Sequence, residues 1–419
     1  MDGDYIKIAS YEAKVGEVKR VLLLYSGGLD SSCMIPWLKE KYGCEVVTLT
    51  VNLGQMADDL EVVRERALKL GAEDALVVDA TKRFWEECLT RAILANACYN
   101  GYYLSTPLGR VVTCEVAVET AKEVGADAIG HGCTGKGNDQ VRFDAGILAL
   151  WEEAKIVAPV REWGMGRAEE IEFAKQHGID VSVVKRSPYS HDDNLWGVTS
   201  EGREIEDAEE VPRLEEALSV CNTPQNAPDE PVQVEIEFKE GIPVGLNGER
   251  LEGVELVRRL NRLGALHGVG VSVVHEDRIV GLKVRGVYEA PAAHILITAH
   301  KALETLVLTK QQLLQKRALE PTWVRLVYDG LWHEPARSDL DALFATANRT
   351  ATGSVLVELY KGNCVALAVK SRYSLLDARL ATFEAETLFN KNASAPFIEL
   401  YSLQMRRAMH IHRLAEEGE

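Results

Sequence analysis

The chain has 419 residues, of which 46% are hydrophobic and 26% are charged, and its formal net charge is −17. This length suits two domains, and the apolar content is ordinary for a soluble globular protein with a large core. The acidic balance argues against a nucleic-acid-binding surface, which needs clustered Lys and Arg, and no apolar run approaches the length of a membrane span.

The first predicted element is a buried strand, because residues 21–24 form an uninterrupted apolar run of the kind found in parallel sheets. The sequence Ser-Gly-Gly-Leu-Asp-Ser-Ser follows at 26–32, and residues 33–40 are predicted to be helical, with Pro36 in the first turn. A strand, a glycine turn and a helix N-terminus form an anion site, since unpaired backbone N–H groups face the ligand. The alternative is an ordinary glycine turn, but the hydroxyls at both ends and Asp30 between them favour phosphate binding.

Strands and helices then alternate, which is typical of a doubly wound parallel sheet. Further strands are predicted at 45–51, 75–78, 127–130 and 181–184. Helices are predicted at 59–70, 84–98, 111–124 and 167–177. Residues 102–110 are polar and contain a proline, so they are predicted to form a loop that leads into the helix at 111–124. We therefore expect an α/β domain over residues 1–179.

A second glycine-rich stretch, His-Gly-Cys-Thr-Gly-Lys-Gly-Asn-Asp-Gln-Val-Arg-Phe, follows the strand 127–130 directly. Residues 130–136 have the spacing of the common phosphate loop, but Gly137 stands where that loop has its Mg²⁺-binding hydroxyl, so we reject that interpretation. The alternative of a solvated turn is disfavoured by the density of polar groups. Donors and charges come from Thr134, Lys136, Asn138, Asp139 and Arg142.

The character of the sequence changes after residue 187. Residues 201–231 are acidic and contain four prolines, which predicts an irregular excursion. Residues 232–239 alternate between apolar and polar, which is typical of a half-exposed antiparallel strand. Helices are also predicted at 251–263 and 292–316, and strands at 271–275, 279–284 and 355–360. We expect an α+β domain at 180–373.

The eight cysteines show no CxxC pair and no metal-ligand spacing. The N-terminal sequence lacks the apolar core of a signal peptide. We therefore expect a cytoplasmic protein whose cysteines are reduced and which binds neither zinc nor an iron–sulfur cluster.

The loop SGGLDSS resembles the signature of the PP-loop ATP pyrophosphatases, and together with HGCTGKGNDQVRF it resembles the argininosuccinate synthetase family specifically. The similarity extends to NLGQ, APVREWGM, SHDDNLWG, RIVGLKVRGVYEAP and LYKGN, and so covers most of the chain. The resemblance implies a PP-loop nucleotide-binding domain, a synthetase domain and a C-terminal helical arm at 374–419, through which the subunits of a homotetramer pack on one another.

The resemblance also implies a carbon–nitrogen ligase that uses ATP and Mg²⁺. A ureido oxygen of L-citrulline attacks the α-phosphate and expels pyrophosphate, and the amine of L-aspartate then displaces AMP to give argininosuccinate. Positioning and fixed charge would supply most of the catalysis. Nucleic acids and membranes are not expected partners.

Individual residues acquire roles from the same resemblance. The catalytic candidates are Asp30, Lys136, Asp139 and Arg142. The expected ATP contacts are Tyr25, Ser26, Gly27, Gly28, Asp30, Ser31, Ser32, Gly132 and Gly135. The expected aspartate contacts are Thr134, Asn138, Asp139 and Arg110. The expected citrulline contacts are Tyr102, Asn138, Arg142, Ser190, Thr199, Glu276 and Tyr288. No residue is expected to ligate a metal, and no pair of residues indicates a general base.

Several departures from the family pattern fall on the acceptor side. Pro107 and Thr199 replace two usual serines, and Val284 replaces a usual Ser or Thr. A lost donor can leave a polar substrate group unpaired, which costs about 1–3 kcal/mol. The alternative hypothesis is therefore a related ligase that joins aspartate to a different ureido, amide or carbonyl acceptor. A non-catalytic nucleotide-binding protein is a third hypothesis, and the intact polar residues of both glycine-rich stretches argue against it.

Overall fold

A sheet of five parallel strands forms the N-terminal half of the computed structural model, which describes residues 5–55, 59–180, 188–382 and 387–418. Its strand order is β3-β2-β1-β4-β5, so the predicted first strand lies at the centre. The strands are β1 (Arg20–Leu24), β2 (Glu45–Asn52), β3 (Asp74–Asp79), β4 (Ala128–Gly130) and β5 (Lys155–Val157).

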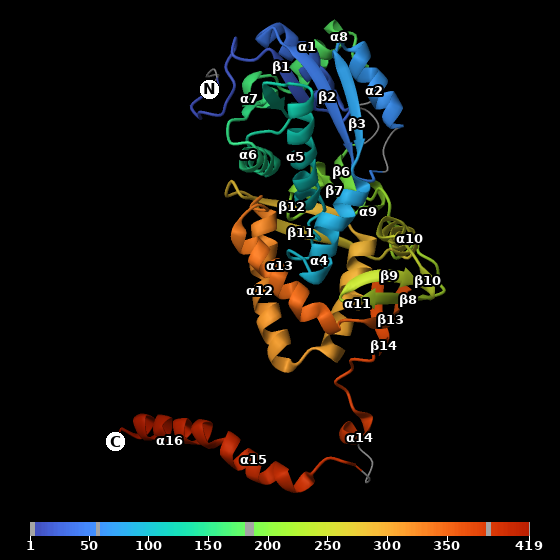
Figure 1. Ribbon diagram of the computed structural model, residues 1–419, viewed down its shortest axis with the longest axis vertical. Coiled ribbons are helices and arrows are strands. Elements are labelled where there is room, and N and C mark those ends of the chain that lie inside the picture. The colour runs from blue at the N-terminus through green and yellow to red at the C-terminus, as the bar shows by residue number, and fades with distance from the viewer. Residues whose placement is uncertain (1–4, 56–58, 181–187, 383–386, 419) are drawn as a thin grey trace. The chain divides into compact units, whose positions relative to one another are not determined.

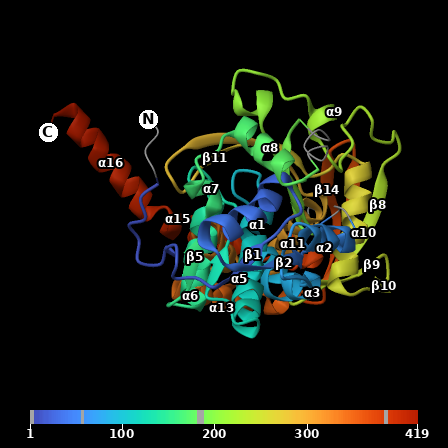
Figure 2. The ribbon, with the colours of Figure 1, turned by 90° about the horizontal axis from the view of Figure 1, so that it is seen from above.

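Helices cover both faces of this sheet, as the apolar run of β1 predicts. Leu22 joins a core that includes residues of α5, whereas Val21 and Leu23 join a core that includes residues of α1. Helices α1 and α8 pack against each other and lie together at the top of Figure 1 and near the centre of Figure 2. The longer helices of this half are α1 (Leu29–Tyr42), α2 (Leu60–Lys69), α5 (Ser105–Glu123), α6 (Asp139–Leu150) and α8 (Arg167–Gln176).

Two antiparallel sheets and a group of helices follow. The first sheet has the order β11-β12-β7-β6, with β6 (Ser190–Asn194), β7 (Gly197–Glu201), β11 (Val271–Asp277) and β12 (Lys283–Glu289). The second has the order β10-β9-β8-β13-β14, with β8 (Val232–Lys239), β9 (Ile242–Leu246), β10 (Glu249–Arg250), β13 (Gly353–Tyr360) and β14 (Asn363–Lys370).

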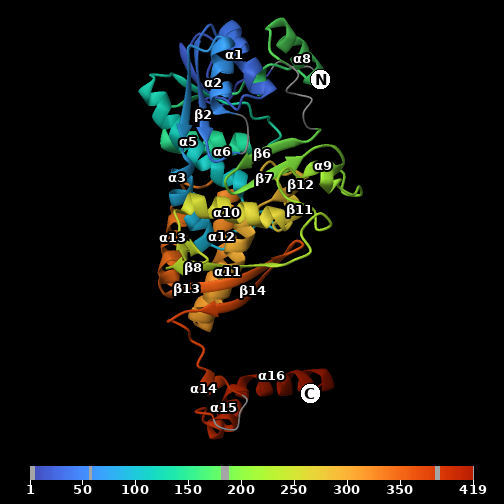
Figure 3. The same cartoon turned by 90° about the vertical axis from the view of Figure 1, so that its right-hand side faces the viewer.

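Helix α11 connects these two sheets, because it packs on β13 and β14 and also contacts β7 (Figure 3). Among the described residues, the α-helices of this half are α9 (Leu214–Ala217), α10 (Gly253–Leu266), α11 (Pro291–Val307), α12 (Lys310–Tyr328) and α13 (Pro335–Ala347). The predicted fold class, a parallel α/β sheet followed by an α+β region and a helical C-terminal segment, is confirmed.

Several predicted boundaries are wrong. Residues 102–110 are not a loop, because α5 begins at Ser105, and Pro107 fits its first turn, where no intrahelical N–H donor is needed. The predicted strand 279–284 is displaced to Lys283–Glu289, since residues 278–282 form the hairpin turn, in which Gly281 has a φ of 86°. The predicted helix 292–316 is two helices that meet at a capping box on Thr309.

Other predictions have mixed outcomes. The predicted helix 84–98 contains a π-helical segment, Phe84–Leu89, and ends with α4 (Thr90–Leu94). Helix α6 was not predicted, and its first residue is Asp139. The predicted strand 181–184 lies outside the described residues.

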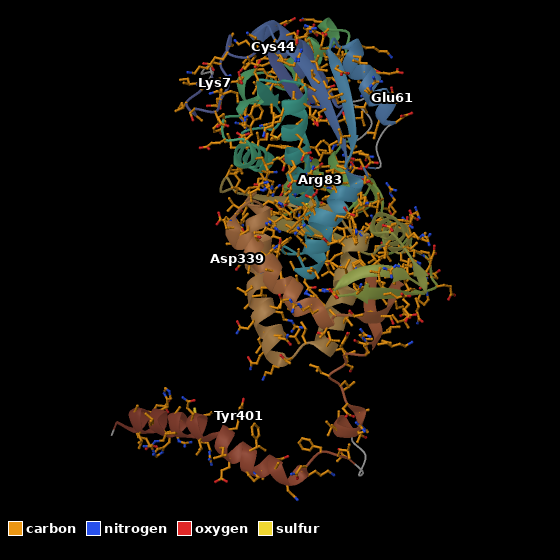
Figure 4. The ribbon with its side chains drawn as sticks, in the orientation of Figure 1. Lys7, Cys44, Glu61, Arg83, Asp339 and Tyr401 are labelled. Carbon is orange, nitrogen blue, oxygen red and sulfur yellow. The ribbon has the colours of Figure 1, made fainter. Side chains whose placement is uncertain are left out.

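Contacts divide the chain into residues 1–373 and residues 374–419. The second unit contains α14 (Ala378–Ala381), α15 (Ser394–Tyr401) and α16 (Leu403–Glu417). Its large apolar side chains are exposed, among them Phe397 and Tyr401, and the latter projects from its helix in Figure 4. No helix in the described part of the chain combines the length and apolar character that crossing a bilayer requires.

Candidate active site

A cavity of about 980 Å³ lies where β1 and β4 end, and it extends to the sheet that contains β6 and β7. Most of the residues expected to contact ligands line it. They are Tyr25, Ser26, Gly28, Asp30, Ser31, Tyr102, Arg110, Gly132, Thr134, Asn138, Asp139, Arg142, Ser190, Thr199 and Glu276. The remaining ones do not line it, namely Gly27, Ser32, Gly135, Lys136 and Tyr288.

The loop after β1 has the geometry of an anion cradle. Gly27 is buried with a φ of 77°, which favours glycine, and Gly28 precedes the first residue of α1. The Ser26 and Ser31 hydroxyls lie 3.1 Å apart. Ser32 is buried behind the loop, 3.0 Å from the Tyr25 hydroxyl, so this serine holds the loop in place. The N-terminal N–H groups of α1 are therefore directed toward the cavity from a fixed loop.

A cluster of charges borders this loop. Nη1 of Arg167, the first residue of α8, lies 2.7 Å from Asp30 and 2.8 Å from Glu170. Glu170 is buried, and its second carboxylate oxygen has no hydrogen-bond partner among the described residues. Burial, and then the neighbouring Asp30, raise the pKa of Glu170 to about 7.

Alternating charges form a chain across the middle of the cavity. Arg110 contacts both Asp139, at 2.9 Å, and Asp192, at 2.6 Å. Arg142 contacts the other oxygen of Asp139 at 2.9 Å. Burial alone would raise the pKa of Asp139, but Arg110 and Arg142 outweigh it and lower that pKa. For Asp192 burial prevails, and its pKa is raised.

Tyr328, at the end of α12, supports this chain from the C-terminal half. Its carbonyl oxygen accepts hydrogen bonds from Nε and Nη2 of Arg142 at 3.0 and 2.9 Å. Its hydroxyl accepts one from Asn138 at 3.1 Å, and the backbone N–H of Ile279 donates to the Asn138 side-chain oxygen at 2.8 Å. Both ends of the Asn138 amide are thereby fixed.

Two of the residues expected to contact citrulline are stacked tyrosines. The rings of Tyr102 and Tyr288 lie 4.4 Å apart, and the Tyr288 hydroxyl donates a hydrogen bond to Glu276. Burial raises the pKa of Glu276. The Tyr102 hydroxyl also accepts the backbone N–H of Thr106 at 3.0 Å, so this tyrosine anchors the start of α5. Tyr288 therefore supports the cavity from behind, through Tyr102 and Glu276.

The residues that depart from the family pattern are dispersed. Thr199 lines the cavity, and its hydroxyl lies 3.4 Å from that of Thr106, which itself donates to Asp192 at 2.9 Å. Pro107 and Val284 do not line the cavity. Thr199 is thus the departure that remains in contact with the cavity.

Sequence reasoning missed several residues of this site: Thr106, Arg167, Asp192, Glu201, Arg278 and Tyr328. For two of them a signal was present, since Asp192 lies in SHDDNLWG and Arg278 opens RIVGLKVRGVYEAP. The ion pair between Arg278, in the hairpin turn after β11, and Glu201, at the end of β7, has a distance of 3.0 Å and joins two segments that no local pattern connects.

Comparisons with known proteins point in one direction. Residues 20–180 match the family described as the arginosuccinate synthase N-terminal HUP domain, and residues 189–408 match the arginosuccinate synthase C-terminal domain. An argininosuccinate synthase from Synechococcus sp. (strain JA-3-3Ab) is 47% identical over 95% of this chain and 99% of its own.

Relatives from other bacteria, which are also named argininosuccinate synthase, show similar identity and coverage. The protein from Rubrobacter xylanophilus is 47% identical over 93% of this chain and 95% of its own. That from Symbiobacterium thermophilum is 45% identical over 92% of this chain and 96% of its own. The family resemblance seen in the sequence is confirmed over nearly the full chain.

Proposed function

This chain belongs to the argininosuccinate synthase family, and from that premise we propose that it joins L-citrulline to L-aspartate while ATP is cleaved to AMP and pyrophosphate. The protein is an ATP-using carbon–nitrogen ligase, as its family is. The comparisons do not favour the alternative hypothesis of a different acceptor. The observation that supports the assignment is the single cavity that the glycine loop of β1 and the charge chain of Asp139 both line.

The nucleotide half of the reaction needs the phosphates fixed and their charge balanced. The N–H groups at the start of α1, with the hydroxyls of Ser26 and Ser31, would bind the β- and γ-phosphates. The ureido oxygen of citrulline forms a bond to the α-phosphorus as the bond to pyrophosphate breaks. This step converts a poor leaving group, the ureido oxygen, into one that departs as AMP.

In the second half, the aspartate amine attacks the ureido carbon and the carbon–oxygen bond to AMP breaks. Thr134, Asn138 and Arg110 are proposed to hold the aspartate, and Arg142 the citrulline carboxylate, for which a guanidinium is well suited. Glu276 and Tyr102 would bind the other end of citrulline. Because the amide of Asn138 is fixed at both ends, it needs little reorganisation when substrates bind.

Mg²⁺ is proposed as the companion of ATP. The lining of the cavity is rich in carboxylates, and the half-exposed Asp30 belongs to the glycine loop itself. Mg²⁺ usually binds to one or two carboxylates and to substrate phosphates, so Asp30 fits as a protein ligand. When bound, the ion would neutralise phosphate charge.

We also propose a homotetramer in the cytoplasm, with three parts at residues 1–179, 180–373 and 374–419. Exposed apolar side chains on α15 and α16 support a role of the last part in assembly, because such a surface usually faces a partner. Sedimentation velocity tests this: a mass of four chains is expected, and a monomer would contradict it.

The reaction is tested by measuring pyrophosphate release from ATP and Mg²⁺ with aspartate, with and without citrulline, and by identifying the product by mass. Citrulline-dependent release with formation of argininosuccinate is expected. Binding of ATP and aspartate without any reaction with citrulline would contradict the proposal.

A further inference from the structure

Among the described residues that line the cavity, the arginines differ in how firmly they are held. The side chains of Arg110, Arg142 and Arg278 are 21%, 5% and 19% exposed, and each pairs with a carboxylate of the cavity. Arg167 is 55% exposed, and its partner Asp30 is 52% exposed. Arg167 also pairs with the buried Glu170, so it can take a new ligand at low cost only through guanidinium atoms that this pair does not use.

The donors of Arg167 are also incompletely used. Both of its ion pairs, to Asp30 and to Glu170, are made by Nη1. Within the described part of the chain, Nε and Nη2 have no hydrogen-bond partner. These two nitrogens form one edge of the planar guanidinium, the edge that binds two oxygens of a phosphate side by side.

Arg167 lies next to the glycine loop. Arg167 is the first residue of α8, and α8 packs on α1, whose N-terminus forms the cradle. A shared apolar cluster that contains Leu29, Cys33 and Ala174 fixes the two helices together. Arg167 thus lines the cavity next to Asp30 of the loop itself.

We propose that Arg167 binds the β,γ-pyrophosphate of ATP through its Nε–Nη2 edge, while Asp30 and Glu170 hold its Nη1. This role rests on the proposed function and adds to the loop a cation that the loop itself lacks. Because positive charge at the leaving pyrophosphate stabilises the transition state, Arg167 is assigned to the leaving group and not to the amino acids.

Glu170 holds Arg167 from the protein side. It is buried, and within the described part of the chain one of its carboxylate oxygens has no hydrogen-bond partner. Its other oxygen lies 2.8 Å from Nη1 of Arg167, so the guanidinium is held by an atom that is not part of the Nε–Nη2 edge.

Binding measurements on the full chain test the proposal. Calorimetry with inorganic pyrophosphate and Mg²⁺, and separately with AMP, is compared for the wild type, Arg167→Gln and Arg167→Lys. We expect Arg167→Gln to weaken pyrophosphate binding about 10- to 100-fold and to leave AMP binding unchanged, since AMP lacks the β- and γ-phosphates. Arg167→Lys, which keeps the charge but loses the edge, should lie between.

A matched control is Arg64→Gln on α2, which removes a similarly exposed arginine paired with Glu61 outside the cavity, and it should alter neither affinity. Unchanged pyrophosphate binding by Arg167→Gln would overturn the proposal. An equal loss of pyrophosphate and AMP binding with a lowered Tm would also overturn it, because Arg167 would then only tether α8. If wild type makes no argininosuccinate but Arg167→Gln still weakens pyrophosphate binding, the fault lies in the proposed function.

Discussion

The two ends of the cavity, which we propose bind the nucleotide and the amino acids, are built in different ways. At the proposed nucleotide end, the backbone N–H groups at the start of α1 and the half-exposed Arg167 border the glycine loop. At the amino-acid end, Arg142 is 5% exposed and is held by Asp139 and by the Tyr328 carbonyl. The first end depends on backbone conformation, and the second depends on side chains that position one another. A substitution at the second end should therefore damage stability and binding together, whereas the two effects should be separable at the first.

The largest effect is expected for Arg142→Met. It leaves Asp139 without one of its two cations and the Tyr328 carbonyl without its donors. Breaking a buried pair by removing one partner costs about 3–5 kcal/mol. We expect the free energy of unfolding to fall by that amount, and kcat/KM for citrulline to fall by about 100-fold or more. Urea unfolding and steady-state kinetics measure the two losses.

Arg285→Met is the control for Arg142→Met. Arg285 is also buried, but it donates to backbone carbonyls of residues 204–210 and does not line the cavity. We expect a loss of stability with little change in the KM for citrulline. If the two variants affect kinetics equally, coupling of stability and binding is not particular to the amino-acid end.

The glycine loop should show the separation of the two effects. Gly27 has a φ of 77°, and a Cβ there would lie 3.0 Å from Val63, so Gly27→Ala should cost about 1–2 kcal/mol of stability. Gly28 has a φ of −74°, and a Cβ would meet only the Ser26 hydroxyl, at 3.5 Å. Gly28→Ala should therefore keep its Tm yet lose ATP affinity, because the methyl group enters the phosphate cradle. Thermal unfolding measures the stability of the two variants, and titration with ATP measures their affinity. A lowered Tm for Gly28→Ala would contradict the expectation that stability and binding are separable at this end of the cavity.

The carboxylates at the two ends also titrate differently. The pKa of Asp139 is lowered, whereas that of Glu170 is raised from 4.5 to about 7 by burial and Asp30. Between pH 4.5 and about pH 7 the folded protein holds a proton on Glu170 that the unfolded chain has lost. Glu170 therefore makes the free energy of unfolding fall as the pH rises through this range. Glu170→Gln should remove that slope between about pH 4.5 and pH 7 in urea unfolding.

Glu172→Gln serves as the control on the same helix, since the Glu172 side chain is 62% exposed. It should leave the pH dependence of the unfolding free energy as in wild type. Parallel curves for Glu170→Gln and the wild type would show that the folded-state pKa of Glu170 is ordinary.

Local patterns predicted those parts of the fold that depend on local periodicity. The alternation at residues 232–239 gave β8 with its bounds unchanged, because a period of two fixes which face is buried. The start of α5 was missed because Ser105, Thr106 and Pro107 favour turns as much as the first turn of a helix. Residues 279–282 were assigned to a strand because their apolar side chains outweighed the turn signal of Gly281.

The site was predictable where a short motif carries it and not where distant segments meet. The loop at 26–32 and the stretch at 131–143 each contain their own chemistry. Tyr328 lies 190 residues from Asn138, and nothing around it in the sequence marks a polar role. The family resemblance assigned ligand contacts but not the residues that hold those contacts in place.

The smallest effect is expected for Pro107→Ser, which restores a residue usual in the family. Pro107 occupies the third position of α5, where its missing N–H leaves no intrahelical bond unmade, and it does not line the cavity. A serine there adds a hydroxyl beside Thr106, whose own hydroxyl is engaged by Asp192. Because position 107 does not line the cavity, we expect the KM for citrulline to change by less than about 2-fold, while stability falls by less than about 1 kcal/mol. Pro107→Ala, which removes the ring without adding a donor, should match Pro107→Ser in both stability and KM. Because the hydroxyl alone distinguishes the two variants, a clearly lower KM for Pro107→Ser would mean that a donor at this position reaches the substrate and that the amino-acid end includes the first turn of α5.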